Sequence, residues 1–146
     1  MNRTLHPVVL EGMPVSLMDA AVTHLADVLR ECQLVLVDGG RAAEVDAELL
    51  TLAAGLVPDL EELREILRGA DVSVVDDTYR VRVEMRMSDE DVMTHLQSQL
   101  VQLRSIGRLG NLLLVSDPTV TQLLAWVWDE AADQLHGREP RPYPHP

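Results

Sequence analysis

The pattern of apolar and polar positions predicts helices over most of the chain. From about residue 17 to 35, apolar residues recur every three or four positions. Ser16 stands where a helix cap is favoured, and Asp19 follows three residues later. The run 34–37 fits either a helix or a short strand, and we favour the helix. The apolar face of this segment comprises Met18, Val22, Leu25, Leu29 and Cys32.

Two further helices are predicted on either side of Pro58. One covers residues 42–55. The other begins at Pro58 and ends at Gly69, since Pro is favoured at the first helical position and Gly just after the last. We expect the pair to form an antiparallel hairpin. The acidic cluster at 59–62 lies in the first turn of the second helix, where the helix dipole favours it, so it does not indicate a ligand site.

Residues 79–87 alternate apolar and charged positions with a period of two, which predicts a β-strand. The upstream run 72–75 and the turn residues Asp76 and Asp77 complete a β-hairpin or extended ribbon over about 72–87. An isolated ribbon is marginally stable in water, so we expect its apolar face to rest on helices. The apolar positions of the strand are Tyr79, Val81, Val83, Met85 and Met87.

Two more helices are predicted, from about residue 88 to 107 and from 118 to about 136. The expected fold is therefore mainly α, a bundle of about five helices with the small ribbon packed on it. We expect residues 1–137 to form a single domain. Alternating prolines forbid a helix over residues 138–146, which are predicted to be an extended tail or linker outside the core.

Composition limits the range of functions. The 146-residue chain has a net charge of −12, which argues against nucleic acid or an anionic membrane as the main partner. The single cysteine, Cys32, cannot form an intramolecular disulfide, and its place on an apolar stripe predicts a buried, inert thiol. No apolar run reaches the ~20 residues of a membrane span, and no signal-peptide pattern is present. We expect a cytoplasmic protein.

Several positions invite a chemical interpretation. Residues 38–41, Asp-Gly-Gly-Arg, are reminiscent of a nucleotide-binding turn, but the chain has no lysine for a phosphate loop. His24 precedes Asp27 by three residues and His95 follows Asp91 by four, yet no metal-binding motif accompanies either pair. We therefore assign no catalytic, cofactor-binding or metal-binding residue, and we expect a protein that is not an enzyme.

Four residues are predicted to make interactions. Trp126 projects about half a turn away from the apolar arc of the last helix, so something should cover it. The cover is either the ribbon or tail of the same chain, or a second subunit or partner domain. Arg80, Arg82 and Arg86 lie on the polar side of the strand, where they are either neutralised by nearby acids or dock an acidic partner surface.

Several stretches of the chain carry a resemblance to a known family. They are Met13–Val15 with His24 and Leu29–Glu31, then Val75–Val81, then Leu112–Pro118 with the helix that follows, and Pro140–Pro144. Together they resemble an uncharacterised domain that precedes ATP-binding modules in actinobacterial sigma-factor-control regulators. The resemblance implies regulation through protein contacts and supplies no catalytic residue. It also implies either a stand-alone relative or the N-terminal domain of a longer protein.

Two functions remain open from the sequence. The first is a non-catalytic regulatory domain that contacts a protein partner or forms a homodimer. The second is a sensor that holds a small apolar ligand in a pocket of the helical bundle. An enclosed apolar cavity of at least ~300 Å³ would favour the sensor.

Overall fold

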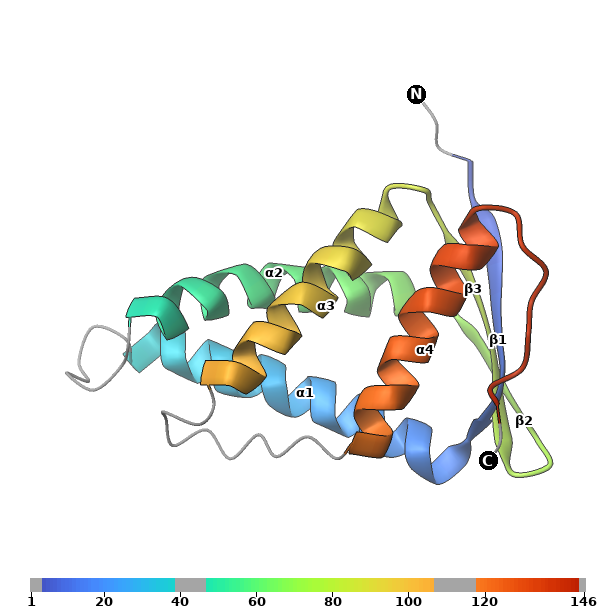
Figure 1. Ribbon diagram of the computed structural model, residues 1–146, viewed down its shortest axis with the longest axis horizontal. Helices are drawn as coiled ribbons and strands as arrows, with labels where there is room; N and C mark the ends of the chain where they lie inside the picture. Colours follow the sequence, from blue (N-terminus) through green and yellow to red (C-terminus); the bar gives the residue numbers. More distant parts are fainter. Residues whose placement is uncertain (1–3, 39–46, 107–117, 145–146) are drawn as a thin grey trace.

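The computed structural model describes residues 4–38, 47–106 and 118–144 of the chain. This part contains four helices on one side of a three-stranded antiparallel sheet, whose strand order is β1-β3-β2 (Figure 1). The predicted class, mainly α with a small β component, is thus confirmed. In chain order the elements are β1 (His6–Pro14), α1 (Val15–Asp38), α2 (Ala47–Arg68), β2 (Asp71–Val75), β3 (Thr78–Met85), α3 (Asp89–Ile106) and α4 (Pro118–Leu135).

The first predicted helix is confirmed, and α1 is longer than expected. The run 34–37, which also fitted a strand, is helical. The backbone N–H of Val15 donates to the Asp77 carbonyl at 3.2 Å, which ties the start of α1 to the hairpin turn. Val22 was expected on the buried face but is 52% exposed. The buried residues of α1 are Ala21, Val28, Leu29 and Cys32.

The two helices predicted around Pro58 are one continuous helix, α2, so the predicted helical hairpin is wrong and the bundle has four described helices rather than five. An interior proline removes a helical donor and costs roughly 3 kcal/mol. The helix continues because its buried stripe runs past the exposed Pro58 without a break. Residues 42–46 lie outside the described residues. The stripe comprises Leu52, Ala53, Leu56, Leu60 and Leu63.

The last two predicted helices are confirmed as α3 and α4. At the start of α3, a carboxylate oxygen of Asp89 accepts a hydrogen bond from the Arg86 N–H at 2.8 Å, as in a capping box. Where α3 crosses α2, Gly55 faces the buried side chain of Gln99, and a Cβ at Gly55 would collide with the Gln99 amide nitrogen. A larger residue at position 55 would therefore require the buried Gln99 side chain to shift.

The predicted hairpin is confirmed, and a third strand that was not predicted joins it. Asp76 and Asp77 have φ values of 50° and 61°, the conformation of a tight two-residue turn between antiparallel strands. Val81, Val83 and Met85 are buried against the helices, whereas Met87 lies beyond the strand and is exposed. The unpredicted strand, β1, pairs with the other side of β3.

The outer edge of β1 is closed by the chain itself. Since Val8 and Leu10 pair with β3, the backbone groups of residues 7, 9 and 11 face outward. Pro7 has no N–H to offer. The side-chain amide of Gln134 accepts from the Val9 N–H at 2.8 Å and donates to the Val9 carbonyl at 2.7 Å. The Glu11 carbonyl accepts from the Tyr143 N–H at 2.8 Å, so the chain itself covers this edge at Val9 and Glu11.

Candidate functional site

The opposite edge of the sheet, β2, carries apolar side chains that the helices do not cover. All five residues of β2 are exposed. Val72 and Val74 are register partners of Val81 and Tyr79, so their side chains lie on the helical side of the sheet, yet they are 60% and 61% exposed. The helices pack on β1 and β3 and stop short of β2.

The backbone of β2 is also open. In a hairpin with a two-residue turn, the residues that flank the turn form a hydrogen-bonded pair, here Val75 and Thr78. The alternation that follows directs the N–H and C=O groups of Val72 and Val74 away from β3. No segment in the described ranges pairs with them. Val72 and Val74 thus present apolar side chains and unpaired backbone groups together.

An apolar groove between α1 and α2 is a further exposed apolar surface. The groove is open to solvent, has a volume of about 500 Å³, and is lined by Val22 and Leu67, which are 52% and 40% exposed. Both residues also line an apolar cavity that includes Val81, the register partner of Val72. We call the set Val22, Leu67, Val72 and Val74 the β2 face.

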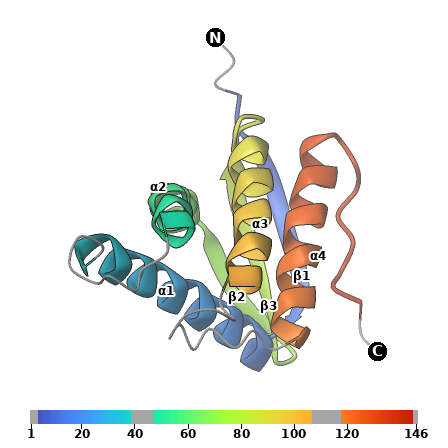
Figure 2. The same cartoon turned by 60° about the vertical axis from the view of Figure 1, so that its left-hand side comes forward.

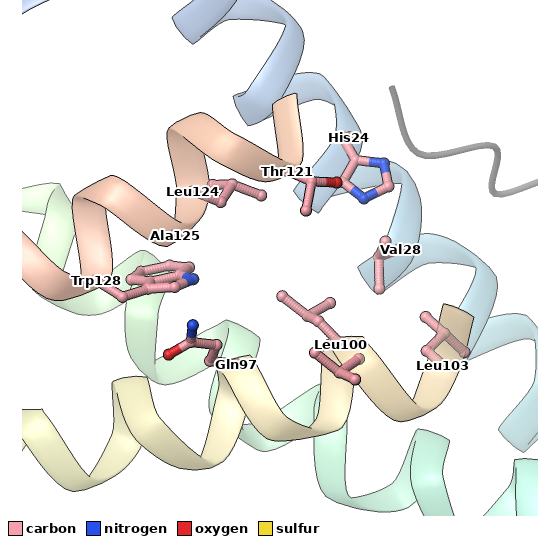
Figure 3. Close-up of a pocket in the computed structure, with 10 residues that line it drawn as sticks. His24, Val28, Gln97, Leu100, Leu103, Thr121, Leu124, Ala125 and Trp128 are labelled. Carbon is pink, nitrogen blue, oxygen red and sulfur yellow. The ribbon is translucent and has the colours of Figure 1, made fainter. Parts of the chain in front are cut away.

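A second candidate site is a small cavity between α1, α3 and α4 (Figure 3). The side chain of Thr121 turns toward the ring of His24, and that of Gln97 turns toward the indole of Trp128. Apolar residues complete the lining. The volume is about 70 Å³, and a second, wholly apolar cavity inside the core has the same volume. Both are far smaller than the ~300 Å³ at which ligand pockets begin.

The predicted interaction residue Trp126 is half-buried and contacts the C-terminal segment of its own chain. The rings of Trp126 and Tyr143 meet edge to face, with centroids 5.2 Å apart and an angle of 87° between the planes. Figures 1 and 2 both place this segment beyond α4, on the side of the molecule away from α2. Cover from the tail was one of the alternatives that the sequence left open; an additional partner at Trp126 stays a prediction.

A buried carboxylate anchors the same segment. The side chain of Glu130 is 2% exposed and accepts hydrogen bonds from the Gln134 amide at 2.6 Å and from the Arg141 N–H at 3.0 Å. The Arg141 guanidinium adds an ion pair with Asp133 at 2.9 Å. Gly12, with φ of 78°, forms a bulge in β1 and lies against Tyr143 and the preceding proline. The segment is extended and largely exposed, yet it is held at these points.

The predicted arginine patch is paired with acids of the same chain. Each of the three guanidinium groups has a carboxylate within 4.0 Å, and all three side chains are about half exposed. Arg86 also pairs with Asp89 at the start of α3. Exposed pairs of this kind contribute ~0–1 kcal/mol each to stability, and docking of an acidic partner surface at these arginines stays a prediction. The pairs are Arg80–Glu11, Arg82–Glu84 and Arg86–Glu62.

The remaining described titratable groups include two that entered the sequence arguments, His95 and Cys32. His95 pairs with Asp59 of α2 at 2.6 Å rather than with Asp91. Burial, and then the charge of Glu31, raises the pKa of Cys32 to about 11, which keeps the thiol protonated at neutral pH. In the described ranges, no three His, Cys, Asp or Glu side chains form a group that could hold a metal ion. None of the described helices is long and apolar enough to cross a membrane.

Sequence reasoning missed the β2 face. The alternation in the hairpin shows which side of β2 is apolar, but it does not show that the helical layer stops before reaching Val72 and Val74. The shortness of β2 and its place before a turn are typical of an edge strand, and this was the available signal. Residues 38–41 and 112–117, which entered the sequence arguments, lie largely or wholly outside the described residues.

Comparison of the chain with models of protein families, with curated proteins and with solved structures finds no match in any of the three.

Proposed function

We propose that this protein is a non-catalytic regulatory domain that acts through protein–protein contacts, and that the β2 face is its contact surface. The observation that carries the proposal is the coincidence of Val72 and Val74 side chains with the open backbone edge of β2. Natural proteins usually protect such edges with charges, prolines or covering segments. Exposed apolar strand edges and apolar grooves are typical of surfaces that bind a protein partner.

The alternative, a sensor for a small apolar ligand, has weaker support. The two most enclosed cavities hold about 70 Å³ each, and the larger α1–α2 groove is open. The polar groups around His24 and Gln97 converge on a space too small for a typical ligand. The small volumes of these two cavities favour protein contacts over ligand sensing.

The resemblance of residues 13–37 and 75–81 to a domain of sigma-factor-control regulators supplies the regulatory part of the proposal. It makes an ATP-binding regulator, or a second copy of the chain, the expected partner. The acidic net charge of −12 favours protein over nucleic acid as the bound surface.

Site-specific photo-cross-linking in cells tests this function. A photoreactive amino acid at Val74 should yield a cross-linked product of defined mass, identified by mass spectrometry as a regulator or a second copy. The matched control is the same amino acid at Thr94, which is exposed on α3 and outside the β2 face. If Val74 gives no more product than Thr94, the β2 face is not a contact surface and the proposal fails.

A further inference from the structure

We propose that β2 pairs with β2 of a second copy, antiparallel about a twofold axis, so that two three-stranded sheets join into one sheet of six strands. This inference rests on the proposed function, in which the β2 face is a protein contact surface, and it names the partner. The sheet has one edge where backbone groups are unpaired within the described chain, and Val72 and Val74 supply them. Antiparallel pairing of the same edge from two copies gives hydrogen-bond partners to these backbone groups in a closed, twofold dimer.

The symmetry and the strand alternation select one register. With Ser73 on the axis, Val72 lies opposite Val74 of the second copy, and the reverse pair is generated by the twofold. Both residues turn N–H and C=O outward, so each pair exchanges two backbone hydrogen bonds. All five residues of β2 take part. Shifting the register by two residues in either direction leaves part of this short strand unpaired.

The side chains fit this register on both sides of the sheet. On the helical side, Val72 and Val74 of both copies form one apolar row. On the other side, Ser73 meets its own copy, and Asp71 lies opposite Val75 rather than opposite another acid. Like charges are thus kept apart despite the acidic net charge.

Charge complementarity at the two ends supports a second copy as the occupant. Val75 is the last residue in register and lies opposite Asp71 of the other copy, because Asp76 and Asp77 turn the chain back toward β3. The acidic turn then lies beside Arg68 of the other copy, whose side chain is 69% exposed and pairs with Glu65 of its own helix. The twofold axis repeats this opposite-charge contact at the other end.

Sedimentation velocity over two orders of magnitude in protein concentration, starting in the low micromolar range, tests the association. The wild type should reach the mass of a dimer. Val74→Arg should weaken association by at least about tenfold, because it places a charge in the apolar row. Val74→Pro should also weaken it while preserving the hairpin, since it removes an N–H that β3 does not use. The matched control is Val37→Arg, a 77% exposed valine at the end of α1, which should leave association unchanged.

A cross-link tests the register. In the proposed dimer the two Ser73 residues face each other as a non-hydrogen-bonded pair, with Cα atoms about 4.5 Å apart, a separation that a disulfide accepts. Ser73→Cys in a Cys32→Ala background should therefore form a covalent dimer on mild oxidation, whereas Thr94→Cys in the same background should not. Circular dichroism verifies the fold of every variant.

The outcomes separate the inference from the proposed function. A wild type that stays monomeric throughout overturns the homodimer, and so does a dimer that Val74→Arg leaves intact. A dimer in which Ser73→Cys fails to cross-link overturns the register. If the chain is monomeric but Val74 photo-cross-links to a different protein, the proposed function stands and the homodimer does not.

Discussion

Removal of residues 139–146 should lower the stability of the domain by a measurable amount. The deletion removes the Arg141 N–H that donates to the buried carboxylate of Glu130, and the Tyr143 N–H that donates to the Glu11 carbonyl. It also removes the edge-to-face contact with Trp126. The segment is largely exposed, so its effect on stability is not evident from burial alone.

The magnitude follows from these contacts. A hydrogen bond to a charged acceptor contributes about 1.5–3 kcal/mol and a neutral one about 0.5–1.5 kcal/mol. An aromatic pair contributes about 0.5–1.5 kcal/mol. The conformational entropy lost on ordering the segment opposes these contacts by about 1 kcal/mol per residue, and by less at the four prolines, whose φ is already fixed. Water reaches Glu130 after the deletion, which limits the loss to about 1–3 kcal/mol, or a Tm decrease of roughly 3–10 °C.

Thermal unfolding followed by circular dichroism measures this change, and tryptophan fluorescence reports exposure of Trp126. Tyr143→Ala should reproduce the aromatic part, about 1 kcal/mol, with a similar shift in fluorescence. Glu139→Ala, at an exposed position in the same segment, is the control and should leave Tm unchanged. A deletion variant whose Tm stays within one degree of the wild type would refute the reasoning, and the segment would then be a loose tail.

Three further predictions concern the helices. Pro58→Ala should raise Tm by several degrees in the same assay, because it restores a helical N–H donor, which should stabilise the protein by about 1–3 kcal/mol. A lower Tm would mean that the proline ring is needed. Gly55→Ala should lower the free energy of unfolding in denaturant by about 1–3 kcal/mol, because the new Cβ collides with Gln99. In a Gln99→Ala background the same substitution should be neutral or stabilising. Equal effects in both backgrounds would exclude the collision. The pKa of Cys32 is raised to about 11, so between pH 9 and 11 the folded thiol keeps a proton that the unfolded thiol has lost. The free energy of unfolding should therefore fall as pH rises through this range, by up to about 1.4 kcal/mol per pH unit. Denaturant titrations of wild type and Cys32→Ala should diverge over this range, and parallel curves would contradict the shift.

Elements with a strong local signal could be predicted from the sequence. The hairpin combines alternation over 79–85 with a turn that suits Asp76 and Asp77, and α4 begins at Pro118 with an unbroken apolar arc. The extent of α2 could not be predicted, because Pro58 locally signals the start of a helix. In the structure, burial of apolar residues before and after Pro58 outweighs that signal. Strand β1 has too few residues with clear alternation, and its pairing with β3 is a non-local event.

The candidate site was still less accessible from the sequence. Val72 and Val74 have the pattern of core residues, and whether such residues are covered depends on where neighbouring helices end. The anchoring of the tail depends on Glu130 and Gln134, which lie four residues apart on α4 and are polar residues in a buried position. The partner of Gln134, Val9, is distant in sequence, and the partner of Glu130, Arg141, follows the last helix. No local sequence pattern therefore indicates either contact.

The closure of β1 has a consequence for the size of any assembly. A sheet with two open edges can add copies at both ends and grow into a fibre, as open strand edges do in aggregates. Here Pro7 lacks an N–H and the amide of Gln134 occupies Val9, so in the proposed dimer the β1 edge would add no further copy. If the proposed dimer forms, Gln134 would limit its sheet to six strands, and Gln134→Ala should give a concentration-dependent series of longer oligomers.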